Sequence, residues 1–256
     1  MTSERKSLGG RVAIVTGSGR NIGRAIAHAL AGEGANIVLN GHRDKAALDA
    51  VAEELRALGV EVMVRLVDVG DAQAVAQMVD DVVGQFGRVD IAVSNVSVRL
   101  RQAFLDISLD DWKRVLDTNL NAAFYMARAV LPHMKQQGWG RIVHISGNDG
   151  FRPIPFRAHN VTCKAATFAL SKAIALEFGE FGVTANTVAP GLTETVRDEA
   201  HYPNFRVEHE KRRQQIPVRR MGRPEDIAES VRFLCSDRAG YITGQIMHVN
   251  GGEHMF

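Results

Sequence analysis

Short runs of apolar residues alternate with longer amphipathic segments along almost the whole chain. The apolar runs lie at residues 11–16, 35–40, 60–68, 90–95, 140–146, 183–190 and 245–250. Each run has the length of a strand, and segments with helical spacing, such as 21–34 and 44–59, separate them. Continuous apolar strands that alternate with helices are typical of a parallel sheet covered on both faces. Because such crossovers are right-handed, we predict an α/β fold with a single doubly wound, Rossmann-like parallel sheet of about seven strands and helices on both faces.

The sequence indicates one domain. Across residues 1–256 there is no internal repeat, low-complexity stretch or linker, and 45% of the residues are hydrophobic, enough for a substantial core. No apolar run approaches the roughly 20 residues that a membrane-spanning helix needs, and the first ten residues are polar. We therefore expect a cytoplasmic protein without membrane association.

Charge and cysteine content exclude further classes of function. The formal net charge is +2 and no basic block stands out, so we expect no nucleic-acid partner. The two cysteines, Cys163 and Cys235, lack the spacing of a metal or redox motif. Both lie in helical patterns, so we predict two buried free thiols and no metal site.

The turn after the first predicted strand is rich in glycine. The stretch TGSGRNIG, residues 16–23, closes this strand and opens the first predicted helix. Glycines at 17 and 19 let the backbone turn tightly, and the amides at the helix N-terminus then face a pyrophosphate, aided by the helix dipole. In this position between a strand and a helix, the pattern indicates dinucleotide binding.

This turn resembles the TGxxxGxG signature of the short-chain dehydrogenase/reductase family, with Asn21 in place of the middle glycine. Other segments resemble the family along nearly the whole chain: DIAVSNVS at 90–97, TNLNAAF at 118–124, VTANTVAPGLTET at 183–195 and the C-terminal stretch 220–252. The resemblance implies an oxidoreductase that uses a nicotinamide dinucleotide on a small-molecule substrate. It further implies that residues 192–220 cover the substrate, and that long helices at 112–137 and 158–181 build a homotetramer.

The same resemblance assigns the cofactor-binding positions. Asp68 would bond the adenine amino group, Asn95 would lie near the adenosine ribose, and Thr195 near the nicotinamide carboxamide. The full set of expected cofactor-binding residues is Gly17, Gly19, Arg20, Ile22, Gly23, Arg43, Asp68, Val69, Asn95, Lys164, Pro190, Gly191 and Thr195.

The end of the second predicted strand bears on the choice of dinucleotide. Enzymes that prefer NAD often place a carboxylate there, which bonds the ribose hydroxyls and repels a phosphate. This chain has Asn40, with Arg20 and Arg43 nearby in the sequence pattern, and a guanidinium can bind a phosphate through two hydrogen bonds. Asp44 is the counter-argument, but its place at a helix start favours capping. We predict a preference for NADP(H), with NAD(H) possible.

The family's catalytic residues carry over only in part. The resemblance maps its asparagine to Asn119 and its lysine to Lys164. Asn160 stands where the tyrosine acid is expected, and Gly147 where the serine is expected. An asparagine side chain donates a hydrogen bond to an oxyanion but releases no proton at pH 7. Loss of a general acid typically slows a reaction by about 10²–10⁴.

Three other residues are candidate replacements. His159 titrates near neutrality, but it lies about 100° around a helix from position 160. Ser146 is one residue from the expected serine, and side chains alternate along a strand, so it should point to the other face. Tyr202 lies in the stretch expected to cover the substrate.

Three functional hypotheses follow. The first is an NADP(H)-linked oxidoreductase that takes its proton from a water molecule held by Asn119 and Lys164, with Asn160 polarising the substrate carbonyl. The second is a catalytically silent nucleotide-binding protein, either a sensor or the partner of an active relative. The third is a non-redox lyase or hydrolase in the vacated pocket. The retained nucleotide-binding residues favour the first.

Overall fold

The computed structural model describes residues 6–196 and 205–255, and they form one seven-stranded sheet. Its strands are β1 (Val12–Thr16), β2 (Asn36–Gly41), β3 (Val62–Leu66), β4 (Ile91–Ser94), β5 (Gly140–Ile145), β6 (Val183–Pro190) and β7 (Ile246–Val249). The strand order is β3-β2-β1-β4-β5-β6-β7, and every pairing is parallel. The predicted doubly wound sheet is therefore confirmed.

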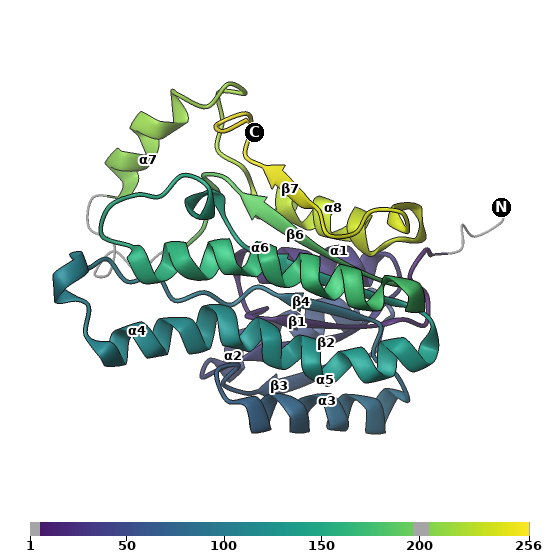
Figure 1. The fold of residues 1–256 in the computed structure, drawn as a ribbon. Coiled ribbons are helices and arrows are strands. Elements are labelled where there is room, and N and C mark those ends of the chain that lie inside the picture. Colours follow the sequence, from purple (N-terminus) through teal and green to yellow (C-terminus); the bar gives the residue numbers. More distant parts are fainter. Residues whose placement is uncertain (1–5, 197–204, 256) are drawn as a thin grey trace.

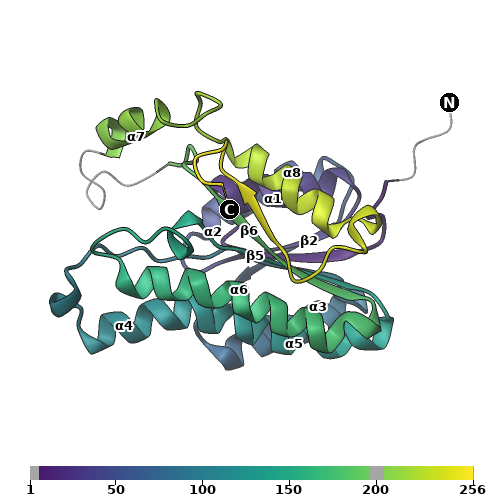
Figure 2. The ribbon, with the colours of Figure 1, turned by 45° about the horizontal axis from the view of Figure 1, so that its top comes forward.

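Helices cover both faces of this sheet. They are α1 (Asn21–Gly32), α2 (Lys45–Arg56), α3 (Ala72–Phe86), α4 (Leu109–Leu116), α5 (Ala122–Gln137), α6 (Ala158–Phe178), α7 (Phe205–Arg213) and α8 (Pro224–Cys235). Figures 1 and 2 show α1, α2 and α8 on one face, and α3, α5 and α6 on the other. Helix α7 lies away from both layers, beside the C-terminal end of the chain (Figure 1).

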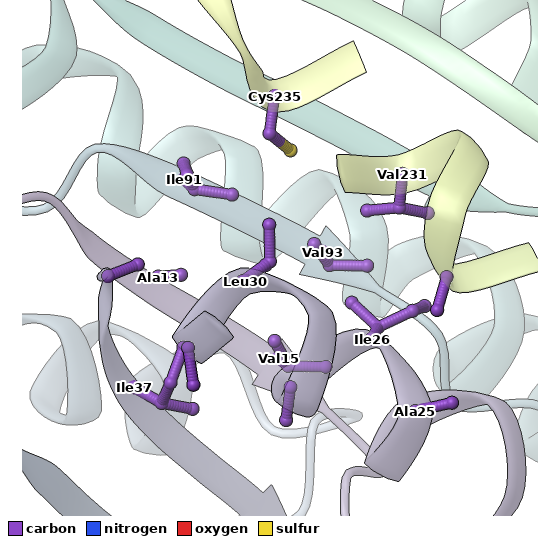
Figure 3. Close-up of a cluster of buried hydrophobic side chains, with 14 of the residues drawn as sticks. Ala13, Val15, Ala25, Ile26, Leu30, Ile37, Ile91, Val93, Val231 and Cys235 are labelled. Atoms are coloured by element: carbon purple, nitrogen blue, oxygen red, sulfur yellow. The ribbon is translucent and has the colours of Figure 1, made fainter. Parts of the chain in front are cut away.

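Two apolar clusters fill the spaces between the sheet and its two helix layers. The cluster under α1 and α8 packs Ile26 and Leu30 against Val15 and Val93 of the sheet, with Val231 above them (Figure 3). Its buried residues also include Cys235, whose sulfur lies among these side chains (Figure 3). Burial raises the pKa of this thiol to about 12. Cys163 is a buried free thiol as well, so both cysteine predictions are confirmed.

Helix boundaries agree with the sequence pattern in most places. The side chain of Asp44 accepts a hydrogen bond from the amide of Ala47, so it caps a helix as predicted, and Asp71 caps α3 in the same way by accepting from Gln73 and Ala74. The helix expected at 112–137 begins earlier, at Leu109, and a π-helical segment (Asp117–Asn121) interrupts it. The segment 192–220, which the family resemblance places over the substrate, contains α7. None of the described helices is long and apolar enough to cross a membrane.

Three buried polar side chains, from β5, α6 and β6, are connected by hydrogen bonds. Nδ1 of His144 lies 2.8 Å from Oγ of Ser171, which lies 2.8 Å from Oγ1 of Thr187. Nε2 of His144 has no partner among the described residues, and the ring is fully enclosed. Burial therefore lowers the pKa of His144 to about 4.

His144 predicts an acid sensitivity of the fold. The pKa of His144 falls from 6.5 to about 4 on folding, so folding favours its neutral ring. The resulting contribution to the unfolding free energy is complete above pH 6.5 and is lost as the pH falls toward 4. The expected loss is about 3 kcal/mol of unfolding free energy. Urea unfolding at pH 7.5 and pH 4.5 measures this loss in the wild type. The control is His144→Gln, which should lose less unfolding free energy between the same two pH values. A variant whose stability falls with pH as steeply as that of the wild type would contradict this assignment.

Candidate functional site

The phosphate-binding turn between β1 and α1 is held by tight backbone contacts. Gly17 has φ +64°, a conformation that side chains disfavour. A Cβ atom on Gly23 would lie 2.2 Å from the carbonyl oxygen of Gly17. Nδ2 of Asn95, at the end of β4, donates to the carbonyls of Thr16 and Gly17 at 3.0 and 3.3 Å. No side chain of the described residues caps α1, so the first amides of this helix are available for an anion.

The corner beyond β2 presents positive charge. Asn40 is buried, and its Nδ2 donates to the carbonyl of Val67 at 3.1 Å, so its side chain turns toward β3. Arg20 and Arg43 are exposed, and neither has an ion-pair partner within the described part of the chain. Position 40 carries an amide rather than a carboxylate, so it does not repel a phosphate. The guanidinium groups of Arg20 and Arg43 therefore suit a phosphate group at this corner.

Asp68 follows β3 and faces solvent. Its Oδ1 accepts from the amide of Gly70 at 2.9 Å, and its Oδ2 lies 3.8 Å from Nε2 of His42. It lines a surface pocket of about 390 Å³ together with Asp71 and residues of α4. The neighbouring Val69 is buried in the core, and it lines a second, smaller cavity.

The backbone of Val98 joins two of the predicted catalytic side chains. Oδ1 of Asn119 accepts from the Val98 amide at 2.7 Å, and Nδ2 of Asn119 donates to the Val98 carbonyl at 2.7 Å. The same carbonyl accepts from Nδ2 of Asn160 at 3.3 Å. Asn119 lies in the π-helical segment, a feature found frequently at functional sites. The structure therefore brings Asn119 and Asn160 to one backbone group.

The side chain of Asn160 is completely buried, and among the described residues only its Nδ2 atom has a hydrogen-bond partner. Oδ1 of Asn160 has no hydrogen-bond partner among the described residues. A buried acceptor without a partner costs about 1–3 kcal/mol, so this atom is poised to receive a hydrogen bond. The side chain therefore presents an acceptor that is free to bind a donor.

Lys164 lies one helical turn beyond Asn160, on the same side of α6. Its Nζ donates to the carbonyl of Ile145 at 3.1 Å, and the side chain is buried. Burial, with a smaller effect from the positive charge of Arg99, lowers the pKa of Lys164 to about 7. Ile145 and Asn119 both line a cavity of about 10 Å³, which has room for about one water molecule.

Ser146 and Gly147 follow β5, and they have different surroundings. Oγ of Ser146 donates to the backbone carbonyl of Lys164 at 2.9 Å, so this buried hydroxyl is committed to α6. Gly147 has extended backbone, and a Cβ atom added to it would meet nothing within 4 Å. The position where a serine was expected therefore faces open space.

His159 is enclosed and engaged on both ring nitrogens. Its Nδ1 accepts from the amide of Asn160 at 2.8 Å, and its Nε2 lies 3.3 Å from Oε1 of Gln102. Gln102 in turn donates to Asp111 at 2.7 Å. Burial lowers the pKa of His159, which favours the neutral ring. Tyr202, the remaining candidate, lies outside the described residues.

The segment after β6 packs against the C-terminus of the chain. A Cβ atom on Gly191, which follows Pro190, would lie 2.7 Å from the backbone of Asn250. Thr195, predicted to lie near the nicotinamide, is on this segment, which a bridge between Thr193 and Gly222 holds in place.

Comparisons with known proteins agree with this geometry. The model of a family described as enoyl-(acyl carrier protein) reductase matches residues 17–254. A 3-oxoacyl-[acyl-carrier-protein] reductase from Staphylococcus epidermidis is 39% identical over 245 residues, which cover 95% of this chain and 98% of the relative. A 3-oxoacyl-[acyl-carrier-protein] reductase from Aquifex aeolicus is 36% identical over 250 residues, 96% of this chain and 98% of the relative. The chain belongs to the short-chain dehydrogenase/reductase family.

A solved structure of a protein described as a short-chain alcohol dehydrogenase, from Sinorhizobium meliloti 1021, has the same fold. Its TM-score to this chain is 0.92 at 29% identity, with 98% of each chain covered. The alignment spans the whole short-chain dehydrogenase/reductase fold, including both helix layers.

Sequence reasoning missed two residues near the site. Val98 supplies the carbonyl that unites Asn119 and Asn160, and an apolar side chain gives no signal of a backbone role. Glu253 accepts from Nη2 of Arg212 at 2.6 Å and from the amide of Leu192 at 3.3 Å, so it joins α7 to the segment after β6. A lone acidic residue three positions from the C-terminus shows no local pattern that would indicate this.

Two glycines of α1, Gly23 and Gly32, give a matched test of the close packing at the turn. Gly23→Ala places a Cβ atom against the Gly17 carbonyl, and we expect it to lower the unfolding free energy by about 1–3 kcal/mol. Gly32→Ala in the same helix meets nothing within 4 Å, and we expect it to be neutral or to stabilise by up to about 1 kcal/mol. Urea unfolding of both variants measures the difference. Equal effects would contradict the close approach at Gly23.

Proposed function

We propose that this chain is an NADP(H)-dependent oxidoreductase of the short-chain dehydrogenase/reductase family, acting on a small carbonyl or alcohol substrate at a non-standard catalytic site. The observation that carries the proposal is Lys164, a buried amine with a pKa lowered to about 7, in a chain that retains the nucleotide-binding turn. An amine that titrates near neutrality is suited to proton transfer at pH 7.

The residues present suit a nicotinamide dinucleotide. The uncapped amides of α1 suit the pyrophosphate, and Arg20 and Arg43 suit a 2′-phosphate. Asp68 is exposed at the edge of a pocket, where it suits an adenine amino group. The remaining positions proposed to bind the cofactor are Gly17, Gly19, Ile22, Gly23, Val69, Asn95, Lys164, Pro190, Gly191 and Thr195. NADPH held there would supply a hydride; NAD(H) is the alternative.

Lys164 and Asn160 together replace the missing acid in this proposal. The ammonium of Lys164 is the proton source, and a water molecule carries the proton to the substrate oxygen. The unpaired Oδ1 of Asn160 accepts a hydrogen bond from that water or from an alcohol substrate. This role differs from the carbonyl polarisation we expected from the sequence, because Nδ2 of Asn160 is already bonded to Val98. Ser146 and His159 are engaged elsewhere, and we give them no part in the chemistry.

The names of the relatives point to the class of substrate. Two relatives are 3-oxoacyl-[acyl-carrier-protein] reductases, and the matching family model is described as an enoyl-(acyl carrier protein) reductase. Hydride addition to an enone produces a stabilised enolate, which needs no proton on oxygen in the same step. A site without a strong acid tolerates enones best, so we propose α,β-unsaturated carbonyl compounds; 3-oxo compounds, which the names of two relatives suggest, would give an alkoxide that needs the proton from Lys164.

Two alternatives remain as competing proposals, because Asn160 and Gly147 replace both residues expected to act on the substrate oxygen. One is a catalytically silent nucleotide-binding protein, a sensor or a partner of an active relative. The other is a non-redox lyase or hydrolase in the same pocket. Each predicts a different fate of NADPH and substrate.

The deciding experiment follows NADPH absorbance with a panel of ketones, 1,3-diketones and enones. We expect turnover that is slow, and that falls about tenfold per pH unit above pH 7 because the Lys164 ammonium is lost. Tight NADPH binding without turnover of any compound would support the silent protein. Loss of substrate at constant NADPH absorbance would support the non-redox enzyme.

The control for this experiment is the double variant Gly147→Ser, Asn160→Tyr. Open space at Gly147 accommodates the serine side chain. If positions 147 and 160 flank the substrate oxygen, the folded double variant reduces ketones faster than the wild type and loses the decline above pH 7. An unchanged rate would contradict our placement of these positions.

Cofactor preference has its own prediction. Removal of one phosphate-binding guanidinium by Arg43→Ala should weaken NADPH binding about tenfold or more and leave NADH binding nearly unchanged. Fluorescence titration with both nucleotides measures the ratio, and Arg56→Ala, at the far end of α2, is the control. Equal weakening of both nucleotides would contradict a phosphate at this corner.

We also propose a homotetramer in the cytoplasm. Large apolar side chains are exposed on the two long helical segments: Leu109 at 77%, Phe124 at 46% and Leu176 at 88%. Such a surface on α4, α5 and α6 suits helix packing between subunits.

A further inference from the structure

A side chain of the phosphate-binding turn reaches across to the segment that follows β6. Oδ1 of Asn21 accepts from the backbone amide of Val196 at 2.9 Å, and Nδ2 of Asn21 donates to the backbone carbonyl of Val196 at 3.2 Å. One carboxamide thus pairs with both polar groups of one residue, as a neighbouring strand would. We call this pair of hydrogen bonds the Asn21–Val196 clamp.

The clamp spans the edge of the sheet where the nucleotide is proposed to bind. Asn21 begins α1, directly after β1, and Val196 follows β6. Two strands, β4 and β5, lie between β1 and β6 in the sheet. Three strand spacings amount to roughly 14 Å, so the clamp closes a connection over the carboxyl ends of four strands. In open α/β sheets a dinucleotide lies along this edge, with its pyrophosphate at the N-terminus of the first helix.

The backbone of Asn21 adopts a conformation that is strained for a residue with a side chain. Asn21 has φ +51°, one of three non-glycine residues with positive φ among those described. Asparagine tolerates this conformation better than most residues, but glycine adopts it without strain. Glycine would therefore suit the turn itself, whereas asparagine adds two hydrogen bonds to a segment 175 residues away.

We propose that Asn21 is a positioning residue that fastens the segment 192–196 over the bound dinucleotide, so that the clamp opens before the cofactor leaves. This inference rests on the proposed function only in that a dinucleotide binds at the turn. The clamp forms between two parts of the chain itself, so the contact can be tested without cofactor.

Asn21→Gly is the sharpest variant, because it removes both hydrogen bonds and keeps the positive φ. We expect NADPH to dissociate about tenfold faster from this variant, since two exposed hydrogen bonds together amount to about that factor. The association rate should change little. Val196→Ala is the matched control, because it removes an exposed side chain and keeps both backbone groups of the clamp. Stopped-flow fluorescence measures both rates.

A second measurement needs no cofactor. In the apo protein, amide hydrogen exchange at Val196 should be faster in Asn21→Gly than in the wild type and unchanged at Gly222, whose amide bonds the carbonyl of Leu192. Adenosine 2′,5′-bisphosphate, which fills only the adenosine half of the site, should bind the wild type and Asn21→Gly equally.

The outcomes separate the clamp from the proposed function. NADPH release at the wild-type rate from Asn21→Gly, or equal exchange at Val196, would overturn the clamp. Weaker binding of adenosine 2′,5′-bisphosphate by Asn21→Gly would overturn it too, because Asn21 would then act on the shape of the turn. A wild-type protein that binds no NADPH would instead refute the proposed function, while the exchange result would still test the contact.

Discussion

Parallel alignment of all seven strands is the constraint on which the site depends. Because every strand runs in one direction, the carboxyl ends of β1, β4, β5 and β6 meet at one edge, and the chain must turn there each time. The turns leave backbone carbonyls and amides without sheet partners, and polar side chains of neighbouring turns satisfy them. Asn95 bonds the carbonyl of Gly17, and Asn119 bonds both polar groups of Val98. The residues that line the edge therefore also hold its turns in place.

The sequence predicted what depends on local patterns, and the structure supplied what depends on distant contacts. The alternation of apolar runs with amphipathic segments predicted the sheet, and Asp44 predicted the start of α2, because capping acts within three residues. Helix α7 was missed because its composition is strongly polar, so no apolar periodicity marks it. The π-helical segment was missed because one extra residue in a helical turn leaves no compositional trace. The bond from Asn160 to Val98 spans 62 residues, and no local rule predicts such a contact.

The charged form of Lys164 lowers the unfolding free energy of the protein, because burial disfavours its ammonium group. Its pKa falls from 10.5 to about 7, which corresponds to roughly 5 kcal/mol against the charged form. For a lysine with a lowered pKa, this cost is complete below pH 7 and fades as the pH rises toward 10.5, where both folded and unfolded forms are neutral. Within the described residues its Nζ donates only to the backbone carbonyl of Ile145, which offsets the cost in part. An apolar residue would stabilise this position, which supports the chemical role that we propose for the ammonium.

The orientation of Asn160 decides which chemistry is open to the vacated pocket. A tyrosine hydroxyl would bring an acidic proton, whereas the free Oδ1 of Asn160 brings only lone pairs. Because the Val98 carbonyl holds Nδ2, turning the amide over would place Oδ1 against that carbonyl, and two acceptors repel. Oδ1 therefore keeps its lone pairs unpaired among the described residues, and in the proposed mechanism its donor is water or a substrate hydroxyl. A buried acceptor one helical turn from a lysine with a pKa near 7 suits the water-mediated proton transfer that we propose, in which one departure from the family pattern, Asn160, acts together with the retained Lys164.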